Sequence, residues 1–349
     1  MEAIVTIGLD IAKSVFQVHG VDANGAVVVR RRLTRAKVLS FFERLPPCLV
    51  GLEACATAHY WGRELRKLGH DVRLMPPSYV KAYVKRGKND AADAEAICEA
   101  VTRPSMRFVP IKSAEQQGAL MLHRTRDLLI RQRTQLINAM RAHLAELGLV
   151  AQTGREGVQQ LMRTVAEADN ERLPSDARVA CQAIIAQLQA VQMQIAGLEK
   201  RIHQAHRANP ASKRLDAIPG FGVIVSTAVV ATMTDPRAFK TGREFAAWIG
   251  LVPRQNSTGG KDRLGSISKQ GDRYLRRLLV VGALAVIRSA RARPDKYPWV
   301  MKLLGRRPAK VVAVALANKM ARIAWAILAK GEAYRAPARS SSAAIAVSA

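Results

Sequence analysis

Short apolar runs bounded by polar turn residues fill the first 30 positions, a pattern typical of β-strands. The runs cover residues 4–9, 15–18 and 27–29, and Asn24-Gly25 precedes the third. An Asn-Gly pair between apolar runs is a strong signal for a turn between strands. The pattern therefore predicts a three-stranded antiparallel meander.

Helical and strand patterns alternate over the next 45 positions. Helical spacing over 34–45 and 57–68 is interleaved with short apolar runs at 48–52 and 72–75. The order β-β-β-α-β-α-β-α with short connections predicts an α/β domain with a mixed sheet.

Long helices are predicted after residue 112. Ser113 with Gln116 is a capping-box signature for a helix from about 114 to 147. Residues 149–175 are polar and are predicted to be irregular. The following segment has apolar residues at alternating spacings of four and three, which form a heptad seam: Ile184, Leu188, Val191, Ile195, Leu198 and Ile202.

Two structures fit this seam. A coiled coil would join copies of the chain into a dimer or tetramer, whereas a packed helix of a bundle would bury the same face within one chain.

The last third is predicted to be mainly helical, with glycine-rich turns. It contains the turn 218–222, a loop over 250–271, and apolar helices near 274–293 and 310–330. The predicted organisation is an α/β domain over 1–112, a long basic helix, irregular linker and coiled coil over 113–210, a helical domain over 211–332 and a disordered tail over 333–349.

The charge indicates a polyanionic partner. Lys and Arg number 55 against 27 Asp and Glu, a net charge of +28, and the basic residues are spread along the chain. Such an excess concentrates polyanions around a protein, and nucleic acid is the usual one.

Cysteine spacing and apolar run length exclude other classes. The four cysteines form no CxxC pair, so neither a zinc site nor a disulfide framework is expected. This cysteine usage fits a protein of the reducing cytoplasm. The apolar run 311–328 is interrupted by Asn318, Lys319 and Arg322, so no membrane-spanning segment is expected.

Four carboxylates form the first candidate site. Asp10 and Glu53 end predicted strands, and Asp90 and Asp93 lie three residues apart at the start of a predicted helix. Residues three apart share a helix face, and sites of α/β domains gather at strand ends. Clustered carboxylates match Mg²⁺ or Mn²⁺, the metals of phosphodiester chemistry. Alternatively, Asp90 is an N-cap and Asp93 a first-turn residue favoured by the helix dipole.

The turn 218–222 is the second candidate. Gly220 and Gly222 precede an Ala/Val-rich helix, a sequence that resembles the hairpin of a helix-hairpin-helix motif. There, backbone N–H groups meet a phosphate at a helix N-terminus. An ordinary helix-to-helix turn fits the same residues.

Basic side chains mark further candidate contacts with nucleic acid. In the loop 250–271 and just after it, basic residues lie among glycines and serines. One of these serines could act as a nucleophile. No general base is identifiable within the loop. The alternative is a solvated loop that only binds phosphates. The predicted nucleic-acid-binding side chains outside the glycine turn are Lys88, Arg124, Arg126, Arg131, Arg133, Arg254, Lys261, Arg263, Lys269 and Arg273. For the long helix, a solvated face is the alternative.

Five segments together resemble the DEDD transposases of insertion sequences, those guided by a bridge RNA. The segments are Ile7–Lys13, Glu53–Cys55, Lys88–Ala94, Ile218–Gly222 and Gly250–Gly271, and their order and spacing match over about residues 3 to 330. The resemblance implies a ribonuclease-H-like N-terminal domain, similar to Holliday-junction resolvases, and a C-terminal transposase domain.

The resemblance also implies roles for individual residues. Asp10, Glu53, Asp90 and Asp93 fall on the family's Mg²⁺ ligands. A serine just before the loop glycine joins DNA covalently in the family. Here Ser257-Thr258 precede Gly259, and we assign the role to Ser257 because the residue must be a serine.

The implied function is that of an insertion-sequence transposase that cuts and rejoins DNA under the guidance of a structured non-coding RNA, in a bacterial, nucleoid-associated cytoplasmic setting. Two other functions remain open at this point. One is a metal-dependent resolvase-like nuclease without a covalent intermediate, and the other is a non-catalytic nucleic-acid-binding protein.

Overall fold

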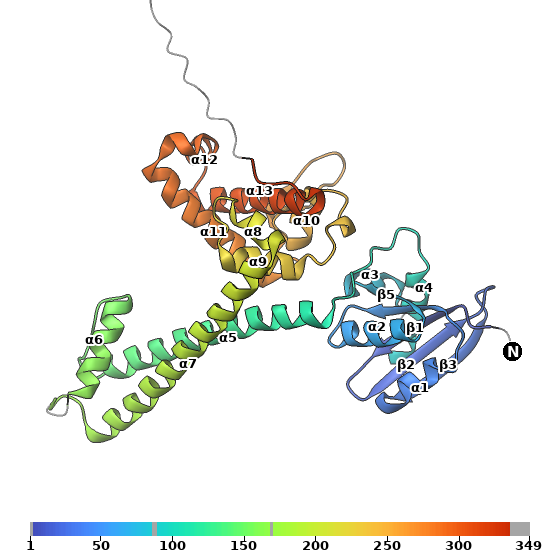
Figure 1. Ribbon diagram of the computed structural model, residues 1–349, viewed down its shortest axis with the longest axis horizontal. Coiled ribbons are helices and arrows are strands. Elements are labelled where there is room, and N and C mark those ends of the chain that lie inside the picture. The colour runs from blue at the N-terminus through green and yellow to red at the C-terminus, as the bar shows by residue number, and fades with distance from the viewer. Residues whose placement is uncertain (1–2, 86–88, 168–169, 336–349) are drawn as a thin grey trace, which may run out of the picture. The chain divides into compact units, whose positions relative to one another are not determined.

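The computed structural model describes residues 3–85, 89–167 and 170–335. The chain divides into two compact units, shown in Figure 1. One contains residues up to Gln117 together with Thr234–Ala238, and the other contains Gly118–Met233 and the chain from Phe239 onward.

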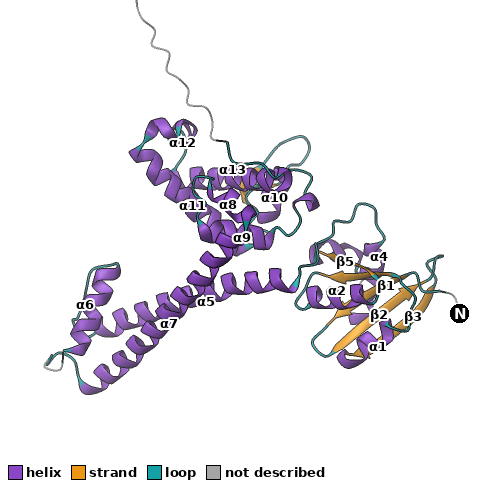
Figure 2. Ribbon diagram, in the orientation of Figure 1, coloured by secondary structure: helices purple, strands orange, loops and turns teal. Residues whose placement is uncertain are grey.

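The N-terminal unit is built on the predicted mixed sheet (Figure 2). Its five strands have the order β3-β2-β1-β4-β5. β1 pairs antiparallel with β2 and parallel with β4, β2 pairs antiparallel with β3, and β4 pairs parallel with β5. The strands are β1 (Thr6–Ile11), β2 (Val15–Val21), β3 (Val27–Thr34), β4 (Leu49–Glu53) and β5 (Asp71–Met75).

Helices cover both faces of this sheet, because its strands alternate between two apolar environments. Ile7 and Leu9 of β1 share a core with the helices that follow β3 and β4, whereas Gly8 between them faces the last helix of the unit. The helices are α1 (Val38–Phe42), α2 (Ala58–Lys67), α3 (Pro77–Val80) and α4 (Asp90–Val101), with 3₁₀ turns at Arg35–Lys37 and Lys81–Tyr83. The helix predicted from residue 34 therefore begins later, because β3 continues to Thr34.

Three helices begin the second part of the chain. α5 (Ala114–Ala145) starts with the predicted capping box, in which the Gln116 backbone N–H donates to Ser113 Oγ at 3.2 Å. α6 (Arg155–Ala166) and α7 (Ser175–Ala208) follow. Cys181 lies near Leu144, and Glu199 lies near Arg126, so α5 and α7 run antiparallel.

The prediction that residues 149–175 are irregular is wrong. They contain α6, whose Val158, Leu161 and Val165 are buried in a core shared with α5 and α7. The glycines at 154 and 157 obscured this short amphipathic pattern.

The heptad seam of α7 is buried within the chain. Leu188 clusters with Met140 and Leu144 of α5, and Val191 and Ile195 cluster with Leu129. Figure 1 shows the two helices side by side. The packed-helix alternative thus accounts for the seam, and a coiled coil between copies is not confirmed.

The rest of the chain is mainly helical, as predicted. Its large core draws on α8 (Pro210–Asp216), α9 (Val223–Thr232), α10 (Gly242–Ile249), α11 (Arg273–Ala292), α12 (Pro298–Leu304) and α13 (Ala309–Lys330). Further 3₁₀ turns lie at Pro236–Ala238 and Pro294–Lys296. The predicted loop 250–271 differs, because it contains a hairpin of β6 (Pro253–Gln255) and β7 (Leu264–Ile267).

Two helices, α7 and α13, are long and apolar enough by length and composition to cross a membrane. Both have packing partners in the described structure. The seam of α7 faces α5, and α13 contributes eight residues to the buried core, from Val312 to Ile327.

The predicted tail lies outside the described residues from 336 onward, and the predicted domain boundaries stay predictions.

We expect Leu188→Ala to lower the free energy of unfolding by about 2–5 kcal/mol, because Leu188 is fully buried between α5 and α7. Met193→Ala on the exposed face of α7 is the matched control and should change stability by less than about 0.5 kcal/mol. Urea unfolding and light scattering on the full chain check both. A lower mass with an unchanged unfolding midpoint would instead place the seam between copies.

Candidate functional site

Helix α4 lies unusually close to strand β1 because the strand presents a glycine to it. A Cβ atom at Gly8 would lie 2.1 Å from the Ala94 carbonyl oxygen and 2.4 Å from the Cys98 nitrogen. On the neighbouring strand, a Cβ at Gly51 would lie 2.8 Å from Val101 Cβ. Only a residue without a side chain permits this approach.

This contact brings three aspartates together. Asp10 lies two residues after Gly8, on the same face of β1, and Asp90 and Asp93 lie in the first turn of α4. One carboxylate oxygen from each aspartate lies within 4.8 Å of the others. The N-cap of α4 is Asn89, whose side chain accepts from the Ala91 backbone N–H at 3.0 Å. The N-cap role considered for Asp90 is therefore wrong.

Glu53 lies within the electrostatic reach of this group. It ends β4, which pairs in parallel with β1 through Leu52 and Leu9. Burial raises the pKa of Glu53, and the negative charges of Asp10 and Asp93 raise it further. The predicted fourth carboxylate is thus adjacent to the aspartate cluster. Among the described residues, however, only the three aspartates have carboxylate oxygens that all lie within 4.8 Å of one another.

The electrostatics of the cluster are dominated by burial and by like charges. Burial raises the pKa of Asp10 from 3.8 to about 6, and Asp93 and then Asp90 add to the rise, while the Ile11 backbone N–H opposes it. The donors are all carboxylate oxygens, which suit a hard divalent cation such as Mg²⁺ or Mn²⁺. The residues present therefore fit a divalent metal.

A second group of functional interest lies in the β6–β7 hairpin. Gly259 and Gly260 have φ angles of 56° and 76°, as a type I′ turn requires. Thr258 and Lys261 close the turn through paired backbone hydrogen bonds of 3.1 and 3.4 Å. The Asn256 N–H also donates to the Arg263 carbonyl at 2.9 Å. This register places Ser257 directly opposite Asp262.

Ser257 is held by two side chains on its face of the hairpin. Its Oγ donates to Asp262 Oδ1 at 2.9 Å and accepts from Gln255 Nε2 at 3.2 Å. Because side chains alternate along a strand, Thr258 points to the other face. Asp262 was not among the predicted site residues, but Gly259-Gly260 is a two-residue hairpin signal from which its pairing with Ser257 could have been found.

The predicted basic residues around this hairpin are exposed, from Arg254 through Arg263. Arg254 Nη2 donates to the Ser268 carbonyl at 3.4 Å. Lys269 adopts a left-handed backbone with φ 56°, and Arg273 opens α11.

The basic residues of α5 differ in their partners. Arg126 is largely buried and forms an ion pair of 2.6 Å with Glu199 of α7, so it connects the two helices. Arg131 lies 3.7 Å from Asp127, and Arg124 is exposed. Lys88 lies outside the described residues, and Arg133 is half-buried.

The two glycines of the 218–222 turn have different surroundings. Gly220 has a φ of 86°, and a Cβ there would lie 2.7 Å from the Gly282 carbonyl of α11. A Cβ at Gly222 would have open space within 4 Å, and this residue precedes α9 as its N-cap. Gly220 therefore serves the packing of the turn on α11, whereas Gly222 is exposed.

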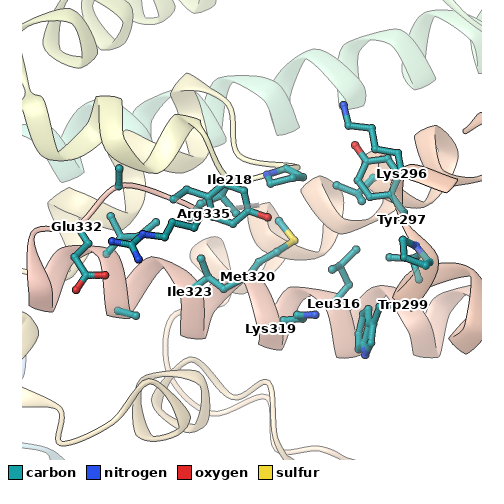
Figure 3. A pocket seen from close by; sticks show the side chains of 18 of the residues that line it. Ile218, Lys296, Tyr297, Trp299, Leu316, Lys319, Met320, Ile323, Glu332 and Arg335 are labelled. Carbon is teal, nitrogen blue, oxygen red and sulfur yellow. The ribbon is translucent and has the colours of Figure 1, made fainter. Parts of the chain in front are cut away.

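A cavity of about 790 Å³ lies beside this turn (Figure 3). Its lining is mainly apolar and includes Ile218, Trp299, Leu316 and Met320. Over the described part of the chain, none of the predicted site residues lines it, so the cavity and the predicted chemistry are separate features.

Comparison with known protein families gives two matches. A family described as "Transposase IS116/IS110/IS902 family" matches residues 212–298. A second family, described as "Transposase" and labelled as the DEDD type of IS110, matches residues 7–148. The carboxylates lie in the second match and the hairpin in the first.

Individual relatives match nearly the whole chain. A "probable family 20 transposase" of Pseudomonas aeruginosa is 54% identical over 94% of this chain and 98% of its own length. The "transposase for insertion sequence element IS1328" of Yersinia enterocolitica is 38% identical over 96% and 99%. The "transposase for insertion sequence element IS1111A" of Coxiella burnetii is 38% identical over 96% and 92%.

We expect Gly8→Ala to separate α4 from β1, because the added methyl group would overlap the backbone of α4. Overpacking of this kind costs about 1–3 kcal/mol of stability. Mn²⁺ binding, measured by calorimetry, should weaken as well. Gly118→Ala in α5 is the control: its Cβ has open space, so it should stabilise the helix by about 0.5–1 kcal/mol and leave Mn²⁺ binding unchanged. Unaltered Mn²⁺ binding by the Gly8 variant would contradict the role of this contact.

We expect Asp10→Asn to stabilise the metal-free protein near neutral pH. A carboxyl whose pKa is raised on folding contributes stability that is present below about pH 4 and is lost as the pH rises through about 6. Removing the charge should restore about 1 kcal/mol at pH 7, after allowance for solvent screening at this half-exposed site, and nothing at pH 4. Thermal unfolding in a chelator at both pH values checks this, and a less stable variant at pH 7 would refute it.

Proposed function

Because this chain belongs to the IS116/IS110/IS902 transposase family, whose members cut and rejoin DNA, we propose that it does so with two separate chemical groups. One is the carboxylate cluster of the N-terminal unit. The other is Ser257 of the β6–β7 hairpin. The meeting of three aspartates within 4.8 Å at the end of β1 is the observation that carries this proposal.

Asp10, Asp90 and Asp93 would hold a divalent metal, Mg²⁺ or Mn²⁺, with Glu53 beside them. A metal bound there would supply a positive charge for the non-bridging oxygens of a scissile phosphate. Two features of the cluster support this role. Its donors are all carboxylates, and the pKa of Asp10 is raised to about 6 by burial and by its two aspartate neighbours.

Ser257 would attack the phosphorus atom and form a phosphoserine link to DNA. Three features of the hairpin support this choice. The serine is exposed, its hydroxyl is oriented by Gln255 and Asp262, and the same hairpin carries three exposed cations, Arg254, Lys261 and Arg263. Thr258 lies on the other face of the hairpin and takes part in the turn through its backbone.

DNA is the substrate, and we propose a structured non-coding RNA of the element as the guide. The net charge of +28 suits two nucleic acids at once. Exposed Arg124 and Arg131 of α5 and the open backbone at Gly222 are candidate contacts with phosphates. Lys88, Arg133, Lys269 and Arg273 are proposed contacts as well.

We also propose a homo-oligomer in which the carboxylate cluster of one copy acts with the serine of another. The α7 seam is buried within the chain, so the contact between copies would use another surface. We propose a cytoplasmic, nucleoid-associated setting for this assembly.

Ser257→Ala should bind DNA normally and form no covalent protein–DNA adduct, because the substitution removes only an exposed hydroxyl group. Thr258→Val is the matched control on the opposite face of the hairpin and should retain adduct formation. The measurement is trapping on nicked DNA under denaturing electrophoresis, followed by peptide mapping of the attached residue.

An adduct mapped to Thr258, Ser266 or Ser268 would refute the assignment to Ser257. Active strand exchange without any adduct would favour the alternative function, that of a metal-dependent resolvase-like nuclease.

A further inference from the structure

We propose that Asp262 is the group that accepts the proton of Ser257 during attack on DNA and returns it during rejoining. This inference rests on the proposed role of Ser257 as the nucleophile. It adds the base that a serine hydroxyl needs, because the hydroxyl is a weak nucleophile unless a neighbouring group takes its proton.

The hairpin geometry aligns the two side chains. The type I′ turn at Gly259-Gly260 pairs residue 256 with 263 and residue 258 with 261, so residues 257 and 262 are direct cross-strand neighbours. The Ser257 hydroxyl already points its proton at Asp262 Oδ1, at 2.9 Å. The amide of Gln255 donates to the same Oγ at 3.2 Å, which leaves the hydroxyl proton for Asp262. A hydrogen bond of this length is within the reach required for proton transfer.

The charge of Asp262 supports a chemical role. Between residues 253 and 268 it is the one Asp, Glu or His, in a segment that also contains Arg254, Lys261 and Arg263. A hairpin that only bound phosphate would be weakened by a carboxylate beside its serine, because the carboxylate repels the phosphate. A carboxylate that removes the serine proton as the phosphate arrives is neutralised by that step, and the repulsion falls.

The atoms balance over the two steps. In cleavage, the Ser257 O–H bond breaks, its proton moves to Asp262, and an Oγ–P bond forms while the P–O bond to the departing strand breaks. The departing oxygen keeps the electron pair of that bond and takes a proton from water. In rejoining, the hydroxyl of the incoming strand loses its proton to the hydroxide left by that water and attacks phosphorus. Ser257 Oγ then leaves and regains its proton from Asp262.

The test is the rate of adduct formation by the full chain between about pH 7 and 9, with Mg²⁺, nicked DNA of the element's end and RNA transcribed from the element. The wild-type rate should be nearly constant over this range. Asp262→Asn should be slower by about 10²–10⁴-fold, and its rate should rise about tenfold per pH unit, because hydroxide must then remove the proton. Asp262→Glu should restore part of the rate and the flat profile. Thr258→Val is the control for the hairpin itself.

Each outcome distinguishes the two proposals. If Asp262→Asn is as fast as wild type, or is slower with an unchanged flat profile, Asp262 only positions the serine and the inference is overturned. If Ser257→Ala still forms the adduct, the proposed nucleophile itself is wrong, whatever Asp262 does. DNA affinity of the Asp262→Asn protein, measured in parallel, must equal or exceed that of wild type; a loss of affinity together with the flat profile would assign Asp262 to hairpin structure and overturn the inference.

Discussion

The contact between α4 and β1 at Gly8 is the interaction on which the carboxylate cluster depends. Asp10, Asp90 and Asp93 repel one another in the metal-free protein, so packing elsewhere must hold them together. Ile97 and Val101 of α4 are fully buried, and each contributes about 1.5–3 kcal/mol. That burial exceeds the cost of charging the half-exposed Asp10, which is about 1 kcal/mol after screening for its own burial and the repulsion by its neighbours together. The cluster can therefore assemble before any cation binds.

Much of this fold could be predicted from local pattern, because each element carries its own periodicity. Three local features could be predicted from the sequence and are present in the structure. They are the Asn24-Gly25 turn, the strand around Leu9 and the Ser113–Gln116 capping box. The gathering of Asp10, Asp90 and Asp93 could be predicted, and Glu53 as a fourth ligand stays a prediction. The geometry of the cluster could not be predicted, because the separation of Asp10 from Asp90 depends on how deeply α4 sits on a glycine 82 residues away in the chain.

The remaining wrong or missing predictions concern which residues contact one another, and not which residues form each helix or strand. A heptad seam shows which face of α7 is apolar, but it carries no information on whether the covering helix comes from the same chain. Here α5 covers it, and the Arg126–Glu199 ion pair joins the same two helices. That pair also removes Arg126 from the exposed basic face that was predicted for nucleic acid. Asp262 was missed for a related reason: its partner Ser257 lies across a turn, five positions away.

The two-residue turn at Gly259-Gly260 makes the serine hairpin sensitive to the parity of its length. If a single residue added or removed at the tip shifted the strand pairing by one position, Ser257 and Asp262 would project from opposite faces of the ribbon. A change of two residues, one on each strand, would preserve their pairing. Homologous hairpins that retain a facing Ser–Asp pair should therefore vary in length by even numbers, and a rare odd change should be accompanied by a bulge that restores the alignment. The length of this segment is thus constrained even where the identities of its exposed residues are free to vary.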